Sequence, residues 1–171
     1  KYKRDVLRIY VYFLTVSGVR PGEEALNIRW SDIDYVETEE GKKDYYRVQI
    51  TAGKKANQHQ RDIKIASRQV IISVDSYLFL EPLKEIRKTD VKDDDLVFCM
   101  PDGSPVTGLS EMFRNCLTDC GLRYASNGAS RSLYSCRHTY ATWKLQHGEL
   151  SYEQLKRQMG TSIMMLEHHY D

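Results

Sequence analysis

Apolar residues recur every three or four positions along most of this chain, which is the spacing of amphipathic helices. The clearest helical pattern runs from Lys3 to Ser17 and is broken at Gly18. A similar pattern predicts a short helix after the Arg20–Gly22 turn, with Leu26 and Ile28 buried. Another helix is predicted for Ile71–Arg87, with Val74, Leu78 and Ile86 facing inward and a kink at Pro82. The remaining predicted helices are Leu109–Cys120, Leu133–His147, Tyr152–Met159 and Met164–Tyr170.

Strict alternation of apolar and polar residues, the pattern of β-strands, is confined to the first half of the chain. Asp44–Ala52 and Arg61–Ala66 predict two strands, joined by a hairpin whose tip, Gly53–Gln60, is polar and basic. A strand near Ile33–Glu37 would complete the sheet. The predicted fold class is therefore α+β, mainly α-helical with a small three-stranded antiparallel sheet.

The composition is that of a globular domain. With 171 residues, 41% hydrophobic and 29% charged, the chain forms one domain or at most two small ones. No stretch has the length of a membrane span, and no signal peptide is visible. Because the chain opens at Lys1 directly in a helical pattern, we expect residues 1–171 to be a fragment of a longer protein.

The cysteines and the charges narrow the classes of partner. Cys116 and Cys120 are four residues apart without further ligands at zinc spacing, so a zinc site is not expected. Together with Cys99 and Cys136 they predict reduced, mostly buried thiols in a cytoplasmic protein. The net charge of +1 gives no argument for nucleic acid, but a local basic face can bind phosphates. Basic residues gather in Lys1–Arg4 and Lys54–Arg61, and acidic ones in Asp90–Asp95.

Two arginines and a tyrosine occupy positions where they could bind an anion such as a phosphate. Arg20 follows a glycine break at a predicted helix N-terminus, where it would strengthen an anion-attracting end; the alternative is a solvent-exposed turn arginine. Arg137 lies on an apolar helix face with Leu133 and Tyr140, so it needs an anion or a structural salt bridge. Tyr134 lies on the same side of that helix, where its phenol would either contact a bound phosphate or pack in the core.

The last residues carry less meaning by themselves. Tyr170 follows Gly160 and a run of hydrophobic residues, a pattern that brings a tail back to a core. His168 and His169 could be metal ligands, but adjacent helical residues point about 100° apart, which favours a solvated face.

Together these residues resemble a known family. The segment Val16–Asp34 resembles the first conserved box of the tyrosine recombinases, also called the phage integrase family. Arg137–Thr142 resembles the second box, Phe98–Gly103 the middle of the domain, and Gly160 with Tyr170 the nucleophile segment. Several boxes in the right order and at the right separation are more specific than any one of them. The resemblance implies the catalytic-domain fold of that family over nearly the whole chain.

The resemblance also implies a chemistry and a set of roles. Tyr170 would attack the scissile phosphate of DNA, leaving a 3′-phosphotyrosyl link and a free 5′-hydroxyl, and Arg20 and Arg137 would clamp the non-bridging oxygens. Lys54 on the hairpin would be the general acid. Lys55 is the alternative, because a shift of one residue in the strand register moves a side chain to the opposite face of the sheet.

The box-one acid of the family is matched by Glu24 or, because of an extra residue in the spacing, by Glu23. It would orient an arginine rather than touch the phosphate. Since the phosphotyrosine conserves the bond energy, neither a metal nor a nucleotide cofactor is implied.

Two positions depart from the family. Tyr134 stands where the family usually has histidine, and Thr161 where it usually has histidine or tryptophan. Neither side chain can act as an imidazole base near pH 7, although both can donate an O–H to a phosphate oxygen. The acceptor for the Tyr170 proton is therefore unexplained. His138 is not at the catalytic histidine position and is interpreted as a helix-packing residue.

The expected partner is double-stranded DNA, which a homotetramer would bind at two synapsed sites. We expect that this fragment can be a monomer by itself, and that it lacks an upstream domain that would encircle the DNA. The protein would be bacterial or phage-encoded. Two alternatives stay open: a DNA-binding relative that has lost cleavage, as Tyr134 and Thr161 suggest, and an enzyme of the type IB topoisomerase kind, which shares the chemistry.

Overall fold

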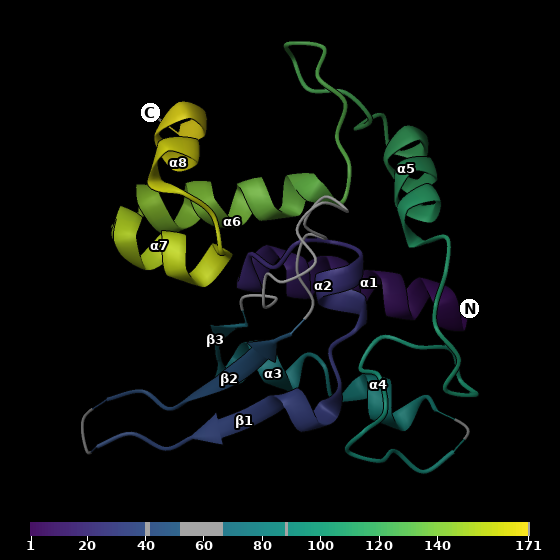
Figure 1. Cartoon of the computed structure of the whole chain (residues 1–171). Coiled ribbons are helices and arrows are strands. Elements are labelled where there is room, and N and C mark those ends of the chain that lie inside the picture. The colour runs from purple at the N-terminus through teal and green to yellow at the C-terminus, as the bar shows by residue number, and fades with distance from the viewer. Residues whose placement is uncertain (40–41, 52–66, 88, 171) are drawn as a thin grey trace, which may run out of the picture.

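The regular structure is mainly helical, and a small antiparallel sheet lies on one side of the long helix α1 (Figure 1). The computed structural model describes residues 1–39, 42–51, 67–87 and 89–170, and only the backbone of residues 167–170. The elements, in chain order, are α1 (Tyr2–Ser17), α2 (Glu23–Leu26), a 3-10 turn (Trp30–Asp32), β1 (Ile33–Val36), β2 (Tyr45–Ile50), β3 (Arg68–Ser73), α3 (Val74–Leu78), α4 (Pro82–Glu85), α5 (Leu109–Asp119), α6 (Tyr134–Gln146), α7 (Tyr152–Met159) and α8 (Ile163–Tyr170).

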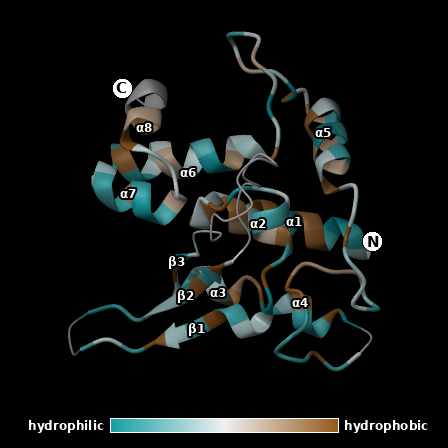
Figure 2. Cartoon of the chain, viewed as in Figure 1, coloured by the Kyte–Doolittle hydropathy of each residue, from teal (hydrophilic) through white to brown (hydrophobic). Residues whose placement is uncertain are grey.

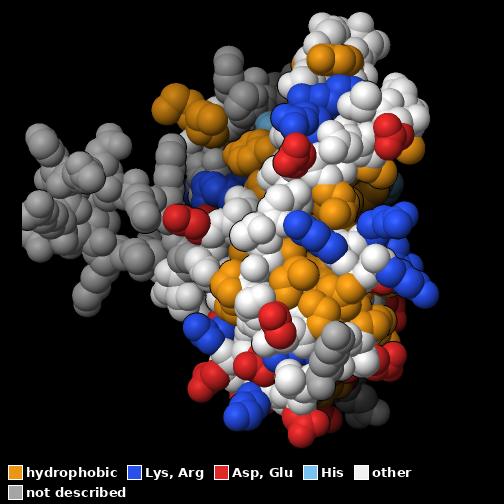
Figure 3. All heavy atoms as spheres, turned by 90° about the vertical axis from the view of Figure 1, so that its right-hand side faces the viewer, with side chains coloured by type: hydrophobic (Ala, Val, Ile, Leu, Met, Phe, Trp, Pro, Cys, Tyr) orange, Lys and Arg blue, Asp and Glu red, His pale blue; other side chains and the backbone are white. Residues whose placement is uncertain are grey.

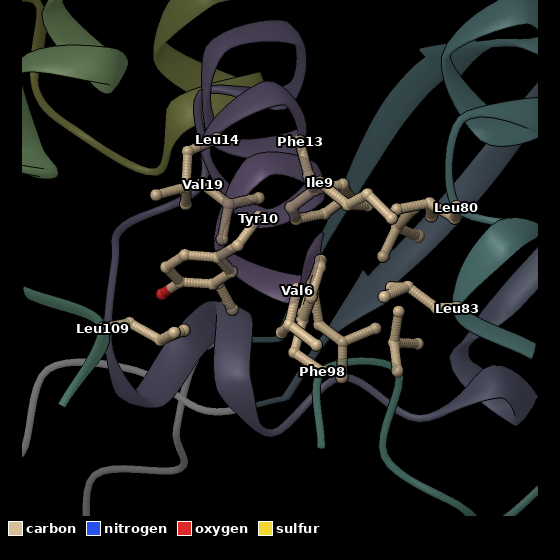
Figure 4. Close-up of a cluster of buried hydrophobic side chains, with 14 of the residues drawn as sticks. Val6, Ile9, Tyr10, Phe13, Leu14, Val19, Leu80, Leu83, Phe98 and Leu109 are labelled. Carbon is tan, nitrogen blue, oxygen red and sulfur yellow. The ribbon is translucent and has the colours of Figure 1, made fainter. Parts of the chain in front are cut away.

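Helix α1 is the central element, with the sheet on one side and α6 on the other (Figure 1). Its buried residues, Val6, Leu7, Ile9, Tyr10, Phe13, Leu14 and Ser17, recur along most of its length, and brown apolar segments alternate with teal polar ones along its ribbon in Figure 2. Figure 4 shows its side chains meeting those of Leu80, Leu83 and Phe98. The Phe98 ring packs edge-on against Tyr10, with 5.0 Å between the ring centroids.

The sheet has the strand order β1-β2-β3, and both pairings are antiparallel. Val48 of β2 lies opposite Ile33 of β1 and Val70 of β3. Alternate residues of β2 and β3 face α1 and are buried, which agrees with the period of a strand that has one covered face. The predicted fold class, mainly helical with a three-stranded antiparallel sheet, is confirmed.

A second, smaller hydrophobic cluster joins the three C-terminal helices. Its buried members are Tyr140, Ala141, Leu155, Met159 and Leu166. It is separate from the main core around α1, so α6, α7 and α8 form a subassembly that is attached to the rest of the molecule through α6 and β3.

The helix predicted for residues 71–87 is wrong in its first part, because residues 68–73 form β3. Val70 and Ile72 are buried while Ile71 is 51% exposed, which is strand alternation. The Ser73 hydroxyl then accepts the N–H of Ser76 and starts α3. Leu78, predicted to face inward, is exposed. Pro82 does interrupt the pattern, as the first residue of α4.

Two further predictions have different outcomes. Cys116 and Cys120 are exposed rather than buried, because α5 packs on the core through its first residues and its last turns extend beyond it; Cys99 and Cys136 are buried. The strand predicted for residues 61–66 lies outside the described residues.

The surface carries no uniform charge on the side that bears α5 and the N-terminus. Figure 3 shows lysine and arginine side chains interspersed with acidic ones there, with apolar side chains exposed between them. Within the described ranges, no helix has the combination of length and apolar surface needed to cross a bilayer.

Candidate active site

Three arginines from distant parts of the chain meet at the C-terminal end of α7. Each donates a hydrogen bond to a different one of three consecutive backbone carbonyl groups, which carry the partial negative charge of a helix end. The pairs are Arg68 Nε with the Gln158 oxygen at 3.2 Å, Arg137 Nη2 with the Met159 oxygen at 2.7 Å, and Arg20 Nη2 with the Gly160 oxygen at 2.5 Å.

A single buried carboxylate, Glu24, links two of these arginines. Its Oε1 accepts from Arg20 Nη1 at 2.6 Å, and its Oε2 accepts from Arg68 Nη2 at 2.5 Å and from the Arg20 backbone N–H at 3.1 Å. Burial raises the pKa of Glu24, but the bonds and charges of Arg68 and Arg20 outweigh it and hold the pKa below its usual value. Glu24 is therefore ionised at neutral pH.

The turn before α2 explains why Glu24 points inward. Gly22 adopts a positive φ of 88°, and its N–H donates to the hydroxyl of Tyr10 at 2.9 Å. This bond anchors the short helix α2 on α1, with Glu24 buried and Glu23 exposed. Of the two acids that the sequence left open, the structure brings Glu24 to the arginines.

Arg137 sits on the buried face of α6 and is 2% exposed. Its Nη1 donates to the carbonyl of Gly18, which ends α1, so one guanidinium bridges the C-terminal ends of α1 and α7. Burial, together with the charges of Arg20 and Arg68, lowers the pKa of Arg137 to about 10. The side chain remains a cation at neutral pH.

The two positions that depart from the family pattern flank this centre. Tyr134 lies one turn before Arg137 and is 45% exposed, so it is not core packing. Its ring meets that of His138 edge-on, with the centroids 5.2 Å apart. Thr161 is half-buried and follows Gly160 directly, in the turn whose carbonyl binds Arg20.

Two predicted site residues are not placed as side chains. Lys54, and Lys55 with it, lies outside the described residues. Tyr170 is the last residue of α8, described by its backbone alone. Helix α8 is docked by Leu166, which is 1% exposed in the C-terminal cluster. The structure thus brings together Arg20, Glu24, Arg137 and the Gly160 turn.

Two residues of this site were not identified from the sequence. Arg68 falls between a predicted strand and a predicted helix, and Gln158 resembles any polar residue on a surface helix. The Gln158 side chain accepts the Ile71 N–H at 3.0 Å and donates to the Ile71 carbonyl at 2.7 Å. The useful signal for Arg68 is an arginine at the first position of an alternating strand pattern.

The arrangement is suited to binding an oxyanion. Three guanidinium groups and one carboxylate leave this cluster of described side chains with an excess of positive charge. Guanidinium groups bind phosphate oxygens through paired, charge-assisted hydrogen bonds. In the part of the chain that the structure describes, no three His, Cys, Asp or Glu side chains come together as a metal site.

Solved structures with the same arrangement of elements identify the fold. The XerH site-specific recombinase bound to difH substrate superposes with a TM-score of 0.69 at 19% identity, over 99% of this chain and 44% of the XerH chain. The XerA recombinase gives 0.64 at 18% identity, over 98% of this chain and 57% of the other. The fold is that of the tyrosine recombinase catalytic domain.

A lambda integrase dimer bound to a core site has the same tyrosine recombinase fold, with a TM-score of 0.61 at 17% identity over 99% of this chain and 56% of that one. The chain spans about half the length of these structures. No family model and no curated protein sequence matches the chain. At these identities the tyrosine recombinase similarity establishes the fold, as the sequence resemblance predicted.

Proposed function

We propose that this chain is the catalytic domain of a site-specific DNA recombinase that cleaves and rejoins strands through a 3′-phosphotyrosyl intermediate. The observation that carries the proposal is the convergence of Arg20 and Arg137 on adjacent carbonyl groups of the turn that leads into α8. Helix α8 ends at Tyr170, and the whole lies in a tyrosine recombinase fold.

The proposed reaction exchanges one phosphodiester for another. The Tyr170 oxygen attacks phosphorus and loses its proton, the bond from phosphorus to the 5′-oxygen breaks, and that oxygen takes up a proton from Lys54. The reverse attack by a 5′-hydroxyl rejoins the strand. The number of phosphoester bonds is unchanged in each step, so the exchange requires no nucleotide.

The arginines would stabilise the charge that gathers on the non-bridging oxygens. A fixed pair of guanidinium groups is already oriented before the substrate arrives, which is the condition for strong electrostatic stabilisation of a transition state. Glu24 holds Arg20 in place, and the ends of α1 and α7 hold Arg137. A phenol with a pKa of about 10 needs such cationic surroundings to react at neutral pH.

Tyr134 and Thr161 would act as hydroxyl donors to the phosphate. The exposure of Tyr134 beside the buried Arg137 leaves its phenol accessible to a bound strand. Because neither residue is an imidazole, proton removal from Tyr170 would fall to water or to the DNA backbone.

The partner we propose is double-stranded DNA. The XerH structure is bound to difH substrate, the lambda integrase dimer is bound to a core site, and the Tn1549 transposon integrase, which has the same fold, is in complex with circular intermediate DNA. By extension, this chain would act within a larger protein that assembles as a homotetramer on two synapsed sites.

A second candidate function is DNA binding without cleavage, favoured by the absence of an imidazole at Tyr134 and Thr161. A topoisomerase of type IB would use the same chemistry without pairing two sites. Relaxation of a single supercoiled circle, compared with exchange between two sites, distinguishes the recombinase from the topoisomerase.

Covalent capture tests the proposal without knowledge of the target sequence. The complete protein is incubated with sheared genomic DNA from its source, and complexes that survive detergent are sequenced to define the site. We expect an adduct with the wild type and with Tyr124→Phe, an exposed control, but none with Tyr170→Phe. Arg137→Ala should lower adduct formation by about 10²-fold or more while DNA binding persists.

Each contrary result has its own meaning. An adduct that persists in Tyr170→Phe would exclude this residue as the nucleophile. Specific binding without any adduct in the wild type would instead support the DNA-binding relative. Equal loss of binding and cleavage in Arg137→Ala would assign that arginine a structural role.

A further inference from the structure

Arg68 has no part in the reaction proposed above, yet its side chain is the most deeply buried of the three arginines after that of Arg137. Its side chain is 13% exposed. Nη2 is 2.5 Å from Glu24 Oε2, and Nε is 3.2 Å from the Gln158 carbonyl oxygen. The edge of the guanidinium formed by Nε and Nη2 is the edge that binds an oxyanion in bidentate fashion. Because protein groups occupy this edge, Arg68 does not present it to a phosphate.

The stem of Arg68 also lies directly against Gly160. A Cβ atom at Gly160 would stand 2.8 Å from the Arg68 Cδ and 2.9 Å from its Nε. Gly160 has a φ of +61°, which glycine adopts without strain. The turn that leads to α8 is therefore packed on this arginine as well as bonded to Arg20.

Helix α7 is tied to β3 at a second point, three residues along the strand. The Gln158 side chain makes its two hydrogen bonds with the Ile71 backbone, while the Gln158 carbonyl accepts from Arg68. Strand β3 and the end of α7 thus form one unit, and Arg68, which belongs to this unit, bonds Glu24 directly.

We propose that Arg68 is a positioning residue, which fixes Glu24 against the Gln158–Gly160 turn and thereby sets the direction of the Arg20 and Arg137 guanidinium groups. This inference rests on the proposed function of those two arginines. Without Arg68, Glu24 is left with Arg20 as its remaining described partner and draws that guanidinium away from the phosphate. A misplacement of about 1 Å is enough to lower a rate by about 10²-fold.

The test compares Arg68→Gln and Arg68→Lys with Arg47→Gln in the complete protein, on the DNA site found by covalent capture. Arg47 is a matched control, because it is also a strand arginine paired with a carboxylate, Asp34, at 3.1 Å but lies on exposed surface. We expect single-turnover cleavage to fall by about 10²-fold in both Arg68 variants, with DNA affinity within a few-fold of wild type. Arg47→Gln should cleave like the wild type.

A double-mutant cycle with Glu24→Gln separates positioning from general loss of stability. If Arg68 acts through Glu24, Arg68→Gln adds little to the loss in cleavage already caused by Glu24→Gln. The conservative Arg68→Lys keeps the charge but cannot reproduce the two-pronged contact, so it should not restore the rate. The inference would be overturned if the fold-losses in cleavage rate of Arg68→Gln and Glu24→Gln multiplied in the double variant, or if Arg68→Lys cleaved at the wild-type rate.

Titration with inorganic sulfate provides a readout that does not depend on cleavage. Wild type should bind sulfate, Arg137→Ala should not, and Arg68→Gln should bind it several-fold more weakly. Sulfate binding unchanged in Arg68→Gln, or absent from the wild type, would overturn the positioning role. A wild type that binds sulfate but forms no DNA adduct would contradict the proposed function alone, since the Arg68 comparison would still be decided by sulfate.

Discussion

At the scale of single residues, the candidate site depends on one buried carboxylate. Glu24 is 4% exposed and holds two arginines that would otherwise repel each other. Removing one member of such a buried set leaves uncompensated charge, which costs about 3–5 kcal/mol in comparable cases. The carboxylate is therefore as important for the stability of this region as for the orientation of Arg20.

The stability contributed by Glu24 should depend on pH. Because its pKa is lower in the folded than in the unfolded chain, this contribution is complete above the unfolded value of about 4.3 and is lost as the pH falls through the folded value. We expect Glu24→Gln to lower the free energy of unfolding by about 3 kcal/mol at pH 7 and by clearly less at pH 3, as measured by urea denaturation. The exposed neighbour is the control: Glu23→Gln should change little at either pH. A pH-independent difference for Glu24→Gln would contradict this account.

The sequence predicted individual site residues where their surroundings were local. Arg137 was conspicuous because it interrupts an apolar helix face, and Arg20 because it follows a break at Gly18. Arg68 could not be recognised in this way, since its partners Glu24 and Gln158 are distant in the chain. Its role follows only from the packing of β3 on α7. The roles assigned to Lys54 and Tyr170 stay predictions.

At the scale of elements, two helix ends create the site. Helices α1 and α7 both end in a left-handed glycine, Gly18 and Gly160, and both leave carbonyl groups that bind Arg137. The pattern of apolar residues predicted α1 and α7 because their signals are local. It failed at residues 71–73, the end of β3, where the strand and the following helix share one apolar run. There the pairing with β2 decides the outcome.

The end of α1 should tolerate no side chain. A Cβ at Gly18 would lie 2.4 Å from a ring carbon of Tyr140 on α6, and the backbone has a φ of +67°. We expect Gly18→Ala to lower the free energy of unfolding by about 2–5 kcal/mol, as the sum of overpacking and left-handed strain. Chemical denaturation measures it.

Gly148 supplies the matched control for this prediction. It has a φ of +62° but nothing within 4 Å of the added atom, so Gly148→Ala should cost only about 1–2 kcal/mol. Equal losses in the two variants would show that the Tyr140 ring yields and that only backbone strain matters.

At the scale of the whole molecule, the site lies where two hydrophobic clusters meet. The main core surrounds α1, and the smaller one joins α6, α7 and α8. Arg20, Arg68 and Arg137 connect the two across the end of α7. A substrate bound at this junction would therefore affect how firmly the α7–α8 unit is held.

We expect the two clusters to open separately. Leu155 and Leu14 are both fully buried, in the small and the main cluster respectively. Leu155→Ala should speed hydrogen exchange mainly in α7 and α8, whereas Leu14→Ala should speed it throughout the domain. In each variant the free energy of the opening that permits exchange should fall by about 2–5 kcal/mol. Uniform acceleration by Leu155→Ala would mean that the domain unfolds as a single unit.

The amide of Gln158 has a consequence beyond the site. Among the described strands, β3 is one of the two outer strands of the sheet, and outer strands offer unpaired N–H and C=O groups to any extended chain that approaches. By bonding both groups of Ile71, Gln158 takes the place of the next strand at that residue. The same contact that ties α7 to the sheet thus also protects the protein against self-association into extended β-structure.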